Sequence, residues 1–357
     1  MNILIVKLSA IGDVIHTLPA LNAIRRYYPD AVISWLVEEA AAPLVTGHEA
    51  LDRVIISGRK RWFKGLGKRG SRIKNIRNIF NFIKTLRDTH YDIIIDFQQL
   101  LKSGIPVWLA KGRLKTGFDK GMEHMEQSHL FLNRRLPPVS MEIHALKRCL
   151  MIPDALGIPV SEIRYRLPVN NKDHQAIEDL LLRHGVKKNK IIVAVNPVAQ
   201  WETKLWQTHK FAELADRLVD DYGAEVVFTG GSDDAPITGE ILSQMKKNAV
   251  DLAGKTTLMT LAALYQKTGL VISTDTGPMH LAAAVRTPVI ALFGPTAPWR
   301  TGPFGYGHRV IRTGVRCSPC FKRHCPGYGG ICMTKISTAD VLAAVHKTGI
   351  FSETVPS

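Results

Sequence analysis

The tetrapeptide DTGP at 275–278 lies between an apolar run and a predicted helix. Its residue types can together bind an anion. The first N–H groups of a helix lack partners within it, Gly277 lets a ligand approach the backbone, and Thr276 adds a hydroxyl donor. His280, about one turn into the predicted helix, would face the same space. The pattern favours an anion site; the alternative is a helix cap, with His280 an ordinary surface residue.

Asp13 is a second candidate for chemistry, because it follows the strand-like run NILIVK at 2–7 and stands at the start of a predicted helix. At the end of a first strand, a carboxylate can act as a general base that faces a cleft. The alternative is that Asp13 only caps the helix or interacts with its dipole.

The late cysteines have the spacing C-x2-C-x4-C-x6-C with His324 alongside. They are Cys317, Cys320, Cys325 and Cys332. This spacing predicts a tetrahedral zinc or iron site with a structural role, which would fix the loop before the last helix. The alternatives are reduced thiols that pack, or disulfides.

A strongly basic run at 59–87 holds eleven Lys or Arg residues and no Asp or Glu. Trp62 and Phe63 lie in its first part, and apolar residues at helical spacing follow. So much unpaired positive charge favours a grip on phosphate or carboxylate groups. The alternative is a solvated loop followed by an ordinary packed helix.

The whole chain has 357 residues, 45% of them hydrophobic, with a formal net charge of +16. Its length predicts two domains, and its charge implies an anionic partner: nucleic acid, an anionic membrane surface or a phosphorylated substrate. No apolar run approaches the length of a membrane span, and the start does not read as a signal peptide. We therefore expect a cytoplasmic protein.

Alternating strands and helices predict an α/β fold with parallel sheets, whose ligands sit at the carboxyl ends of the strands. The polar, proline-bearing stretch at 159–173 predicts a linker between two Rossmann-like domains, 1–165 and 175–357, which face one cleft. The loop before Asp13 has one glycine where a dinucleotide fingerprint needs three, and the glycine turn at 230–231 lacks a following G-K-[ST]. These features disfavour a dinucleotide cofactor and an NTPase.

Several motifs carry a family resemblance. VKLSAIGDVIHTLPAL at 6–21, STDTGPMHLAAA at 273–284 and FGPT at 293–296 resemble the ADP-heptose:lipopolysaccharide heptosyltransferases of glycosyltransferase family nine. Shorter matches extend the resemblance to nearly the whole chain: LVEE at 36–39, DFQQLLKSG at 96–104, NRR at 133–135 and KLW at 204–206.

The resemblance implies a GT-B fold, with an N-terminal acceptor domain and a C-terminal ADP-sugar domain that carries the cysteine-rich loop 317–332. It implies an inverting transfer of L-glycero-D-manno-heptose in which Asp13 is the general base. Lys204 would stabilise the departing diphosphate, and no cofactor is required for the transfer.

The resemblance also implies the substrate contacts. Those with the donor, ADP-heptose, are Thr256, Asp275, Thr276, Gly277 and His280. The expected acceptor contacts are Gly12, Arg59, Lys60, Arg61, Lys64 and Lys102. The acceptor would be the Kdo/heptose inner core on lipid A, at the anionic inner leaflet of the inner membrane, where the protein could be peripheral.

Three other functions stay open at this point. The first is a related family-nine transferase that adds a later heptose or another sugar. The second is a nucleic-acid-binding protein, suggested by the charge and the cysteines, and the third is an NAD-dependent oxidoreductase. The sugar-nucleotide motifs argue against the last two, so we expect no nucleic-acid partner. The LVEE segment and the RWFK sequence at 61–64 resemble the member that adds the first heptose to Kdo, whereas the cysteine cluster resembles other members of the family.

Overall fold

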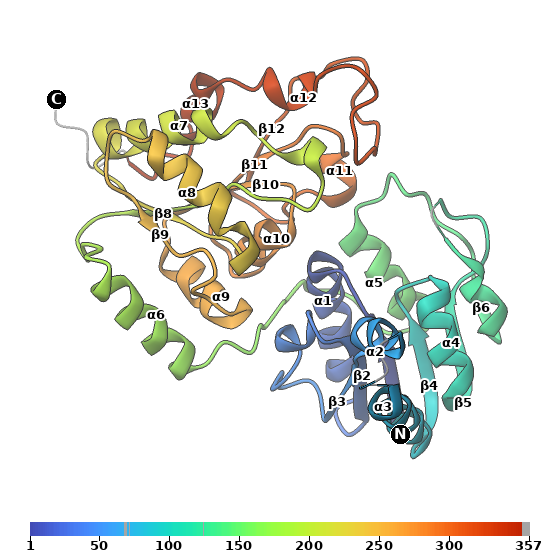
Figure 1. Cartoon of the computed structure of the whole chain (residues 1–357). Helices are drawn as coiled ribbons and strands as arrows, with labels where there is room; N and C mark the ends of the chain where they lie inside the picture. Colours follow the sequence, from blue (N-terminus) through green and yellow to red (C-terminus); the bar gives the residue numbers. More distant parts are fainter. Residues whose placement is uncertain (68–69, 71, 124, 352–357) are drawn as a thin grey trace. The chain divides into compact units, whose positions relative to one another are not determined.

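The computed structural model describes residues 1–67, 70, 72–123 and 125–351. The chain divides into two compact units, Met1–Pro168 and a second that begins at Val169 (Figure 1). Each unit contains a parallel six-stranded sheet with helices packed against it. The predicted α/β class with two Rossmann-like sheets is confirmed. The assignment of the acceptor to one unit and the donor to the other stays a prediction.

The first unit follows the expected alternation of strands and helices. Its elements are β1 (Asn2–Val6), α1 (Ile11–Tyr27), β2 (Val32–Glu38), η1 (Ala42–Leu44), β3 (Arg53–Ser57), α2 (Arg59–Leu66), α3 (Arg72–Arg87), β4 (His90–Asp96), α4 (Leu101–Leu109), β5 (Lys111–Phe118), η3 (Gln127–Phe131), β6 (Arg134–Leu136) and α5 (Ala145–Ala155). The strand order is β3-β2-β1-β4-β5-β6, so the chain reverses its direction of winding between β1 and β4. Ligands of such sheets bind outside the carboxyl ends of the strands at this switch point.

The central strand β1 is apolar along its length because both of its faces are covered. Leu4 and Val6 pack in one cluster with Leu86 of α3 and Val107 of α4. The alternate residues of β1 point to the opposite face of the sheet. Helices α1 and α5 of the same unit pack against each other. The sheet thereby fixes the position of the loops that leave its carboxyl edge.

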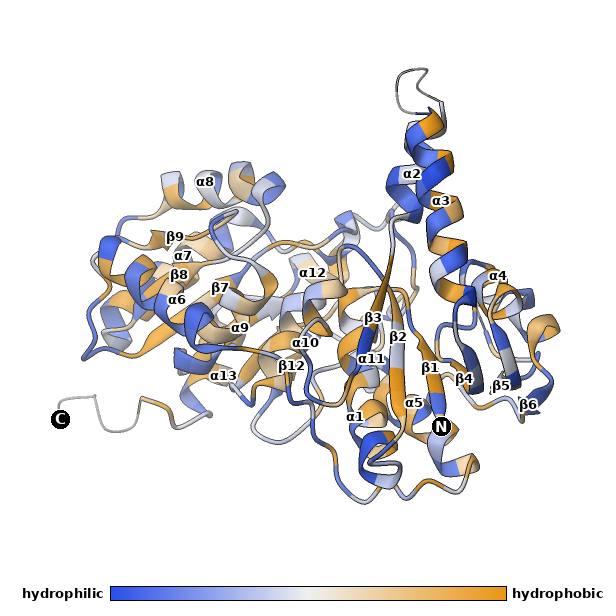
Figure 2. Cartoon of the chain, turned by 90° about the horizontal axis from the view of Figure 1, so that it is seen from below, coloured by the Kyte–Doolittle hydropathy of each residue, from blue (hydrophilic) through white to orange (hydrophobic). Residues whose placement is uncertain are grey.

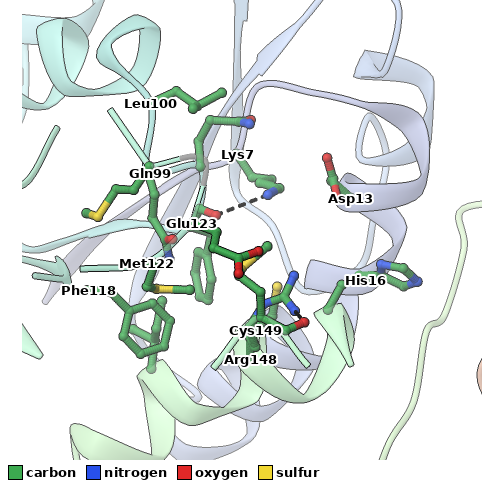
Figure 3. A pocket seen from close by; sticks show the side chains of 16 residues that line it. Lys7, Asp13, His16, Gln99, Leu100, Phe118, Met122, Glu123, Arg148 and Cys149 are labelled. Carbon is green, nitrogen blue, oxygen red and sulfur yellow. Dashed lines mark hydrogen bonds between the residues drawn. The ribbon is translucent and has the colours of Figure 1, made fainter. Parts of the chain in front are cut away.

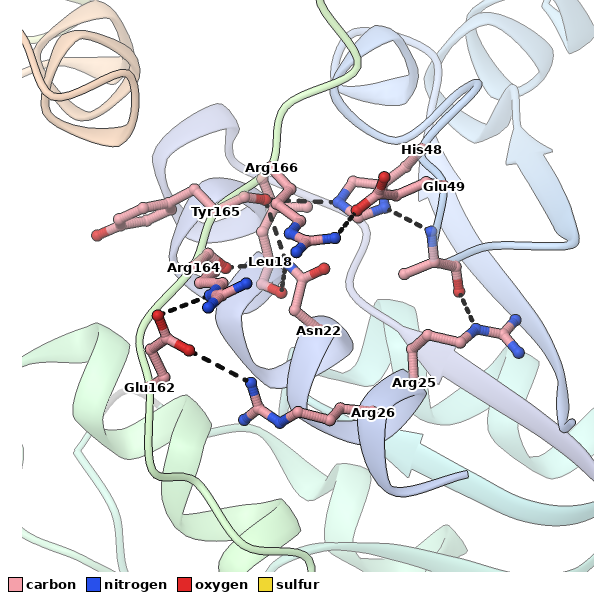
Figure 4. Close-up of polar contacts among 11 residues, drawn as sticks. Leu18, Asn22, Arg25, Arg26, His48, Glu49, Glu162, Arg164, Tyr165 and Arg166 are labelled. Carbon is pink, nitrogen blue, oxygen red and sulfur yellow. Dashed lines mark hydrogen bonds and ion pairs between the residues drawn. The ribbon is translucent and has the colours of Figure 1, made fainter. Parts of the chain in front are cut away.

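The end of the first unit is tied to its own surface (Figure 4). Asn22 Nδ2 of α1 donates to the carbonyl oxygens of Arg164 at 2.8 Å and Tyr165 at 3.2 Å. An ion pair joins Arg26 to Glu162 at 4.0 Å. The predicted linker ended too late, because Asn170 accepts backbone N–H bonds and starts a helix at Asn171.

The second unit repeats the topology of the first. Its elements are α6 (Asn171–Arg183), β7 (Ile192–Asn196), η4 (Glu202–Lys204), α7 (Thr208–Tyr222), β8 (Glu225–Phe228), η5 (Ser232–Asp234), α8 (Ala235–Gln244), β9 (Val250–Asp251), α9 (Leu258–Lys267), β10 (Leu270–Thr274), α10 (Gly277–Ala284), β11 (Val289–Leu292), α11 (Pro298–Thr301), β12 (Arg309–Ile311), α12 (Ile331–Thr334) and α13 (Thr338–His346). The order β12-β11-β10-β7-β8-β9 places its switch point between β7 and β10. Residues of α7 and α13 cover one face of this sheet in a single apolar cluster.

The segment at 40–46 forms only the 3-10 turn η1, and Gly47, with a φ of 80°, turns the chain soon after it. Helix α8 was not predicted, because the segment around it has no clear apolar stripe. Among the helices that the structure describes, none combines the length and the hydropathy needed to cross a membrane.

Candidate active site

In the first unit, the loops that follow β1 and β4 are joined by hydrogen bonds. Gln98 Oε1 accepts from the backbone N–H groups of Leu8 at 3.1 Å and Ser9 at 3.0 Å. Lys7 is buried, and its Nζ donates to the carbonyl oxygen of Phe97 at 3.0 Å. The switch point of this sheet therefore has a fixed backbone from which side chains can act.

Asp13 lies at this switch point, half-buried in the first turn of α1, and lines a pocket of the first unit. Its Oδ2 accepts the backbone N–H of Ala10 at 3.1 Å, so the residue does cap the helix. Figure 3 shows its carboxylate beside the hollow that Lys7 and Arg148 also border, with Met122 on the far side. The two interpretations of Asp13 are thus compatible, because one oxygen caps the helix while the side chain lines the pocket.

Asp96 accepts hydrogen bonds from the loop that follows β4. It is buried at the end of β4 and accepts from the backbone N–H of Gln98 at 2.9 Å, that of Gln99 at 3.2 Å and the hydroxyl of Ser103 at 3.0 Å. Burial raises the pKa of Asp96 to about 6, although these donors and the charge of Lys7 oppose the rise. Its contacts indicate a role in holding the loop.

Lys102 and Gly12, two predicted acceptor contacts, also lie at this edge. Lys102 Nζ donates to Ser9 Oγ at 2.5 Å, and Gly12 precedes Asp13 in α1. Burial lowers the pKa of Lys102, whereas the charge of Glu38 raises it. The ammonium group of Lys102, which belongs to α4, therefore contacts the loop that leads to Asp13.

The sequence suggested that the positive charges of the basic run are unpaired, but three of them form ion pairs. Arg59 Nη2 lies 3.1 Å from Glu38 Oε1, and Lys60 Nζ lies 3.3 Å from Glu38 Oε2. Arg61 forms a further ion pair with Glu39 at 2.6 Å. The carboxylates come from the end of β2, which pairs with β3, so counting charges within the run alone missed them.

Lys64 differs from these three cations. It is exposed near the end of α2 and has no ion pair with any residue that the structure describes. Positions 68, 69 and 71, which also belong to the basic run, lie outside the described residues.

In the second unit, Lys204 and Asp275 meet across the switch point. Lys204 Nζ lies 2.6 Å from Asp275 Oδ2 and donates to the Asp275 carbonyl oxygen at 3.1 Å. Thr296 Oγ1 donates to the same carboxylate oxygen at 2.6 Å. The side chains of Lys204 and Asp275 are 16% and 6% exposed, so the pair is largely sheltered from water.

The segment after Asp275 opens α10 without a side-chain cap. Thr276 occupies the N-cap position, but its side chain makes no capping hydrogen bond, and Gly277 is the first helical residue. The capping alternative is therefore wrong for Thr276. The uncapped helix N-terminus stands directly after the Lys204–Asp275 pair and suits an anion.

Two other predicted donor contacts are placed differently. His280 is 8% exposed within α10, so it is not the surface residue that the alternative expected. Thr256 is half-buried after β9, beside Thr257, which caps α9. Because β8 separates β9 from β7, the sheet order places Thr256 away from Lys204 along the carboxyl edge.

The predicted metal centre has no support in the structure. Cys317, Cys320, Cys325 and Cys332 are free thiols, and residues 1–67, 70, 72–123 and 125–351 contain no group of three or more His, Cys, Asp or Glu side chains that could hold a metal ion. Burial and the neighbouring Cys317 and Cys320 raise the pKa of the Cys332 thiol. Gly330 N–H instead donates to Cys325 Sγ at 3.3 Å.

Some residues of the first unit's pocket were not predicted. Lys7 and Gln98 could have been found, because each stands just after an apolar strand, where ligands of parallel sheets bind. Glu123 and Arg148 had no comparable signal, since one lies in an irregular segment and the other in α5. Only the folded chain brings them to the same pocket.

The chain is similar in sequence to one protein family and to individual members of it. Residues 79–329 match the model of glycosyltransferase family 9 (heptosyltransferase). Lipopolysaccharide heptosyltransferase 1 of Pseudomonas aeruginosa is 31% identical over 338 residues, which cover 91% of this chain and 87% of that protein.

Solved structures of the Escherichia coli heptosyltransferase WaaC are also similar. The structure with ADP has a TM-score of 0.77 and 27% identity, and the match covers 98% of this chain and 100% of that chain. The structure with ADP-2-deoxy-2-fluoro heptose has a TM-score of 0.75 and 25% identity, and covers 97% of this chain and 99% of that chain. The overall fold is therefore of the GT-B type found in these proteins.

Proposed function

The chain belongs to glycosyltransferase family 9, the heptosyltransferase family, and we propose that it transfers L-glycero-D-manno-heptose from ADP-heptose to the Kdo of the lipopolysaccharide inner core. One observation carries the proposal. Lys204, held by Asp275, lies at the switch point of the second unit beside the uncapped N-terminus of α10. This combination of a sheltered cation and a helix N-terminus suits a diphosphate.

On the acceptor side, Asp13 is the general base. Its carboxylate accepts the proton of the acceptor hydroxyl while the hydroxyl oxygen attacks the anomeric carbon of the donor heptose. The hydrogen bond from Ala10 N–H to Asp13 Oδ2 fixes the orientation of the side chain. Attack from the face opposite to the diphosphate inverts the anomeric centre.

On the donor side, the bond from the anomeric carbon to the diphosphate breaks, and negative charge grows on ADP. Lys204 supplies a full positive charge to this leaving group, and Thr276 and the N–H groups at the start of α10 supply hydrogen-bond donors. With these protein groups, the transfer needs no cofactor.

Asp275 acts in this scheme by positioning Lys204. Its Oδ2 already accepts from Lys204 and from Thr296, and a carboxylate facing a diphosphate would repel it. Asp275 therefore holds the ammonium group where the leaving group needs it. Thr256 and His280 complete the donor site, Thr256 toward the nucleoside and His280 from within α10.

The acceptor carries carboxylates and phosphates, and the first unit offers cations for them. Lys102 of α4 donates to Ser9 on the loop that leads to Gly12 and Asp13. Arg59, Lys60 and Arg61 are partly balanced by Glu38 and Glu39, so they grip an anion less strongly than bare cations would. Lys64 has no such partner among the described residues, so it binds an anion more strongly than the other three cations.

For the position of transfer, we propose addition of the first heptose to Kdo. Relatives named lipopolysaccharide heptosyltransferase 1 support this position, and other relatives are named heptosyltransferase 3. The test is to incubate the purified protein with ADP-heptose and a series of truncated cores, and to weigh the products. We expect one added heptose on a core that ends in Kdo; addition only to cores that already carry heptose would assign a later step, and no addition to any core would refute the proposal.

A further inference from the structure

Helix α3 has two apolar sides, and only one of them packs against the protein. Leu86 is buried in the core of the first unit, and the ring of Phe82 lies 5.4 Å from that of Trp62 in α2. Asn75 is buried on the same side. This side anchors the helix to the sheet and to α2.

The opposite side of α3 exposes large apolar residues. Ile73 is 84% exposed, Ile76 is 52% exposed and Phe80 is 67% exposed. Residues three, four and seven positions apart lie on one side of a helix, so these three form a continuous stripe. A stripe of large, exposed apolar residues on one side of a helix indicates a binding surface.

Helix α4 carries a second stripe of the same kind. Leu101, Ile105 and Trp108 follow one another at helical spacing and are 40%, 46% and 63% exposed. The two helices contact each other. Arg87, seven residues after Phe80 and so on the same side of α3, donates to the carbonyl oxygen of Leu109 at the end of α4 at 3.4 Å.

We call the six residues Ile73, Ile76, Phe80, Leu101, Ile105 and Trp108 the α3–α4 apolar face. Figure 2 shows α3 beside α2, extending past the strands of its own sheet, with hydrophobic and hydrophilic residues interleaved along it. The α3 part of the face is therefore presented on a projecting element of the first unit.

The charges around this face are all of one sign along α3. Arg77, Lys84 and Arg87 lie on the same side as the stripe and are exposed, and residues 72–87 include no Asp or Glu. Arg77 and Lys84 form no ion pair with a residue that the structure describes. The long side chains of these cations can reach past the apolar groups to an anionic layer.

From this arrangement we infer that the α3–α4 apolar face docks the protein on an anionic lipid bilayer. Apolar side chains would enter the boundary between headgroups and acyl chains, Trp108 would sit at the interface, and the cations would contact the headgroup phosphates. The inference rests on the proposed function for its setting, because a lipid-anchored acceptor requires an enzyme at the membrane surface. Its test does not depend on catalysis.

The test is cosedimentation of the full chain with vesicles of equal parts phosphatidylglycerol and phosphatidylcholine, and with vesicles of phosphatidylcholine alone. The wild type should bind the anionic vesicles and bind the neutral ones at least about tenfold more weakly. The triple variant Ile73→Ser, Phe80→Ser, Trp108→Ser should need at least about tenfold more anionic lipid for half-maximal binding.

Matched controls separate this face from general surface hydrophobicity. Tyr306→Ser with Tyr328→Ser removes two exposed aromatic residues of the second unit and should leave vesicle binding unchanged. The conservative variant Ile73→Leu, Phe80→Trp should also bind like the wild type. Equal binding by the wild type and the triple variant, or no binding of anionic vesicles by the wild type, would overturn the inference.

Two further measurements complete the design. Brominated lipid should quench tryptophan fluorescence of the wild type more than that of Trp108→Phe, and equal quenching would contradict the placement of Trp108 at the interface. Size-exclusion chromatography with light scattering tests the rival occupant: a wild-type dimer that the triple variant converts to monomer would assign the face to a second copy and overturn the membrane inference. Transfer to a delipidated, water-soluble core should be the same in wild type and triple variant, so failure of docking and failure of the proposed transfer are distinguishable.

Discussion

Lys204 Nζ lies 2.6 Å from Asp275 Oδ2, and the two residues come from loops that follow neighbouring strands, β7 and β10, at the switch point of their sheet. The pair sits directly before the N-terminus of α10. Its geometry explains how one lysine is kept beside the uncapped start of this helix, where we propose that the diphosphate binds.

Lys204→Ala should lower kcat/KM by about ten- to a hundredfold, because a charge-assisted contact to phosphate contributes on the order of 1.5–3 kcal/mol. Asp275→Asn should cause a smaller loss, since the lysine remains but is less well held. If Asp275 acts through Lys204, the double variant should be no worse than Lys204→Ala alone. Steady-state kinetics with varied ADP-heptose checks this, and fully additive losses would mean that Asp275 acts independently.

Gly277→Val should block donor binding while leaving the fold intact. The change puts a branched side chain at the first residue of α10, where the proposed diphosphate must approach the backbone. Calorimetry of the full chain with ADP is the measurement, and circular dichroism checks the fold. Wild-type affinity for ADP in this variant would place the donor site elsewhere.

Neutralising Lys64 should raise the acceptor KM more than neutralising Arg61, because Arg61 is paired with Glu39 and Lys64 has no such partner among the described residues. Neutralising Arg59, Lys60, Arg61 and Lys64 together should raise it further and flatten its dependence on salt. The KM for ADP-heptose should not change.

The control for this prediction is the removal of charge elsewhere. Changing Arg183, Lys187 and Lys188, which are exposed in the second unit, to Gln removes similar charge and should leave the acceptor KM unchanged. An effect of equal size would show that net charge matters and not the α2 cations.

Asp96 should make the stability of the protein depend on pH. Its pKa in the folded state is about 6, above the ordinary value of 3.8, so between these pH values the unfolded chain binds fewer protons than the folded one. The contribution of Asp96 to the free energy of unfolding is therefore full below about pH 4. It falls as the pH rises to about 6, and above that pH it is constant. The total loss is on the order of 2–3 kcal/mol.

Urea unfolding of wild type and Asp96→Asn at a series of pH values tests this. The stability of the wild type relative to the variant should fall as pH rises from 4 to 6, because only the wild type carries the titrating carboxyl. A difference that is constant over this range would show that Asp96 does not titrate there.

Much of the fold could be predicted from sequence because buried parallel strands read as apolar runs followed by polar loops. The runs that became β1, β4, β7 and β10 all have this form, and each ends beside a loop of a candidate site. Strand β5, with the sequence KGRLKTGF, lacks such a run, and only its pairing with β4 reveals it.

Ion pairs between residues far apart in the sequence could not be predicted from the sequence. The partners of Arg59 and Arg61 are Glu38 and Glu39, which lie on another strand, so the run looked uncompensated. The exposed side of α3 was likewise hidden, because its apolar residues read as a stripe that packs. The cysteine spacing suggested a metal, but spacing does not fix which thiols are buried.

The central claim is that Asp13 removes the proton from the acceptor hydroxyl, and the most direct test is heptose transfer by Asp13→Asn. Asn keeps the shape of the side chain and can still accept the Ala10 N–H, but it cannot take a proton. We predict that turnover falls by about 100- to 10,000-fold while calorimetry gives near-normal binding of ADP. Turnover within a few fold of the wild type would contradict the account.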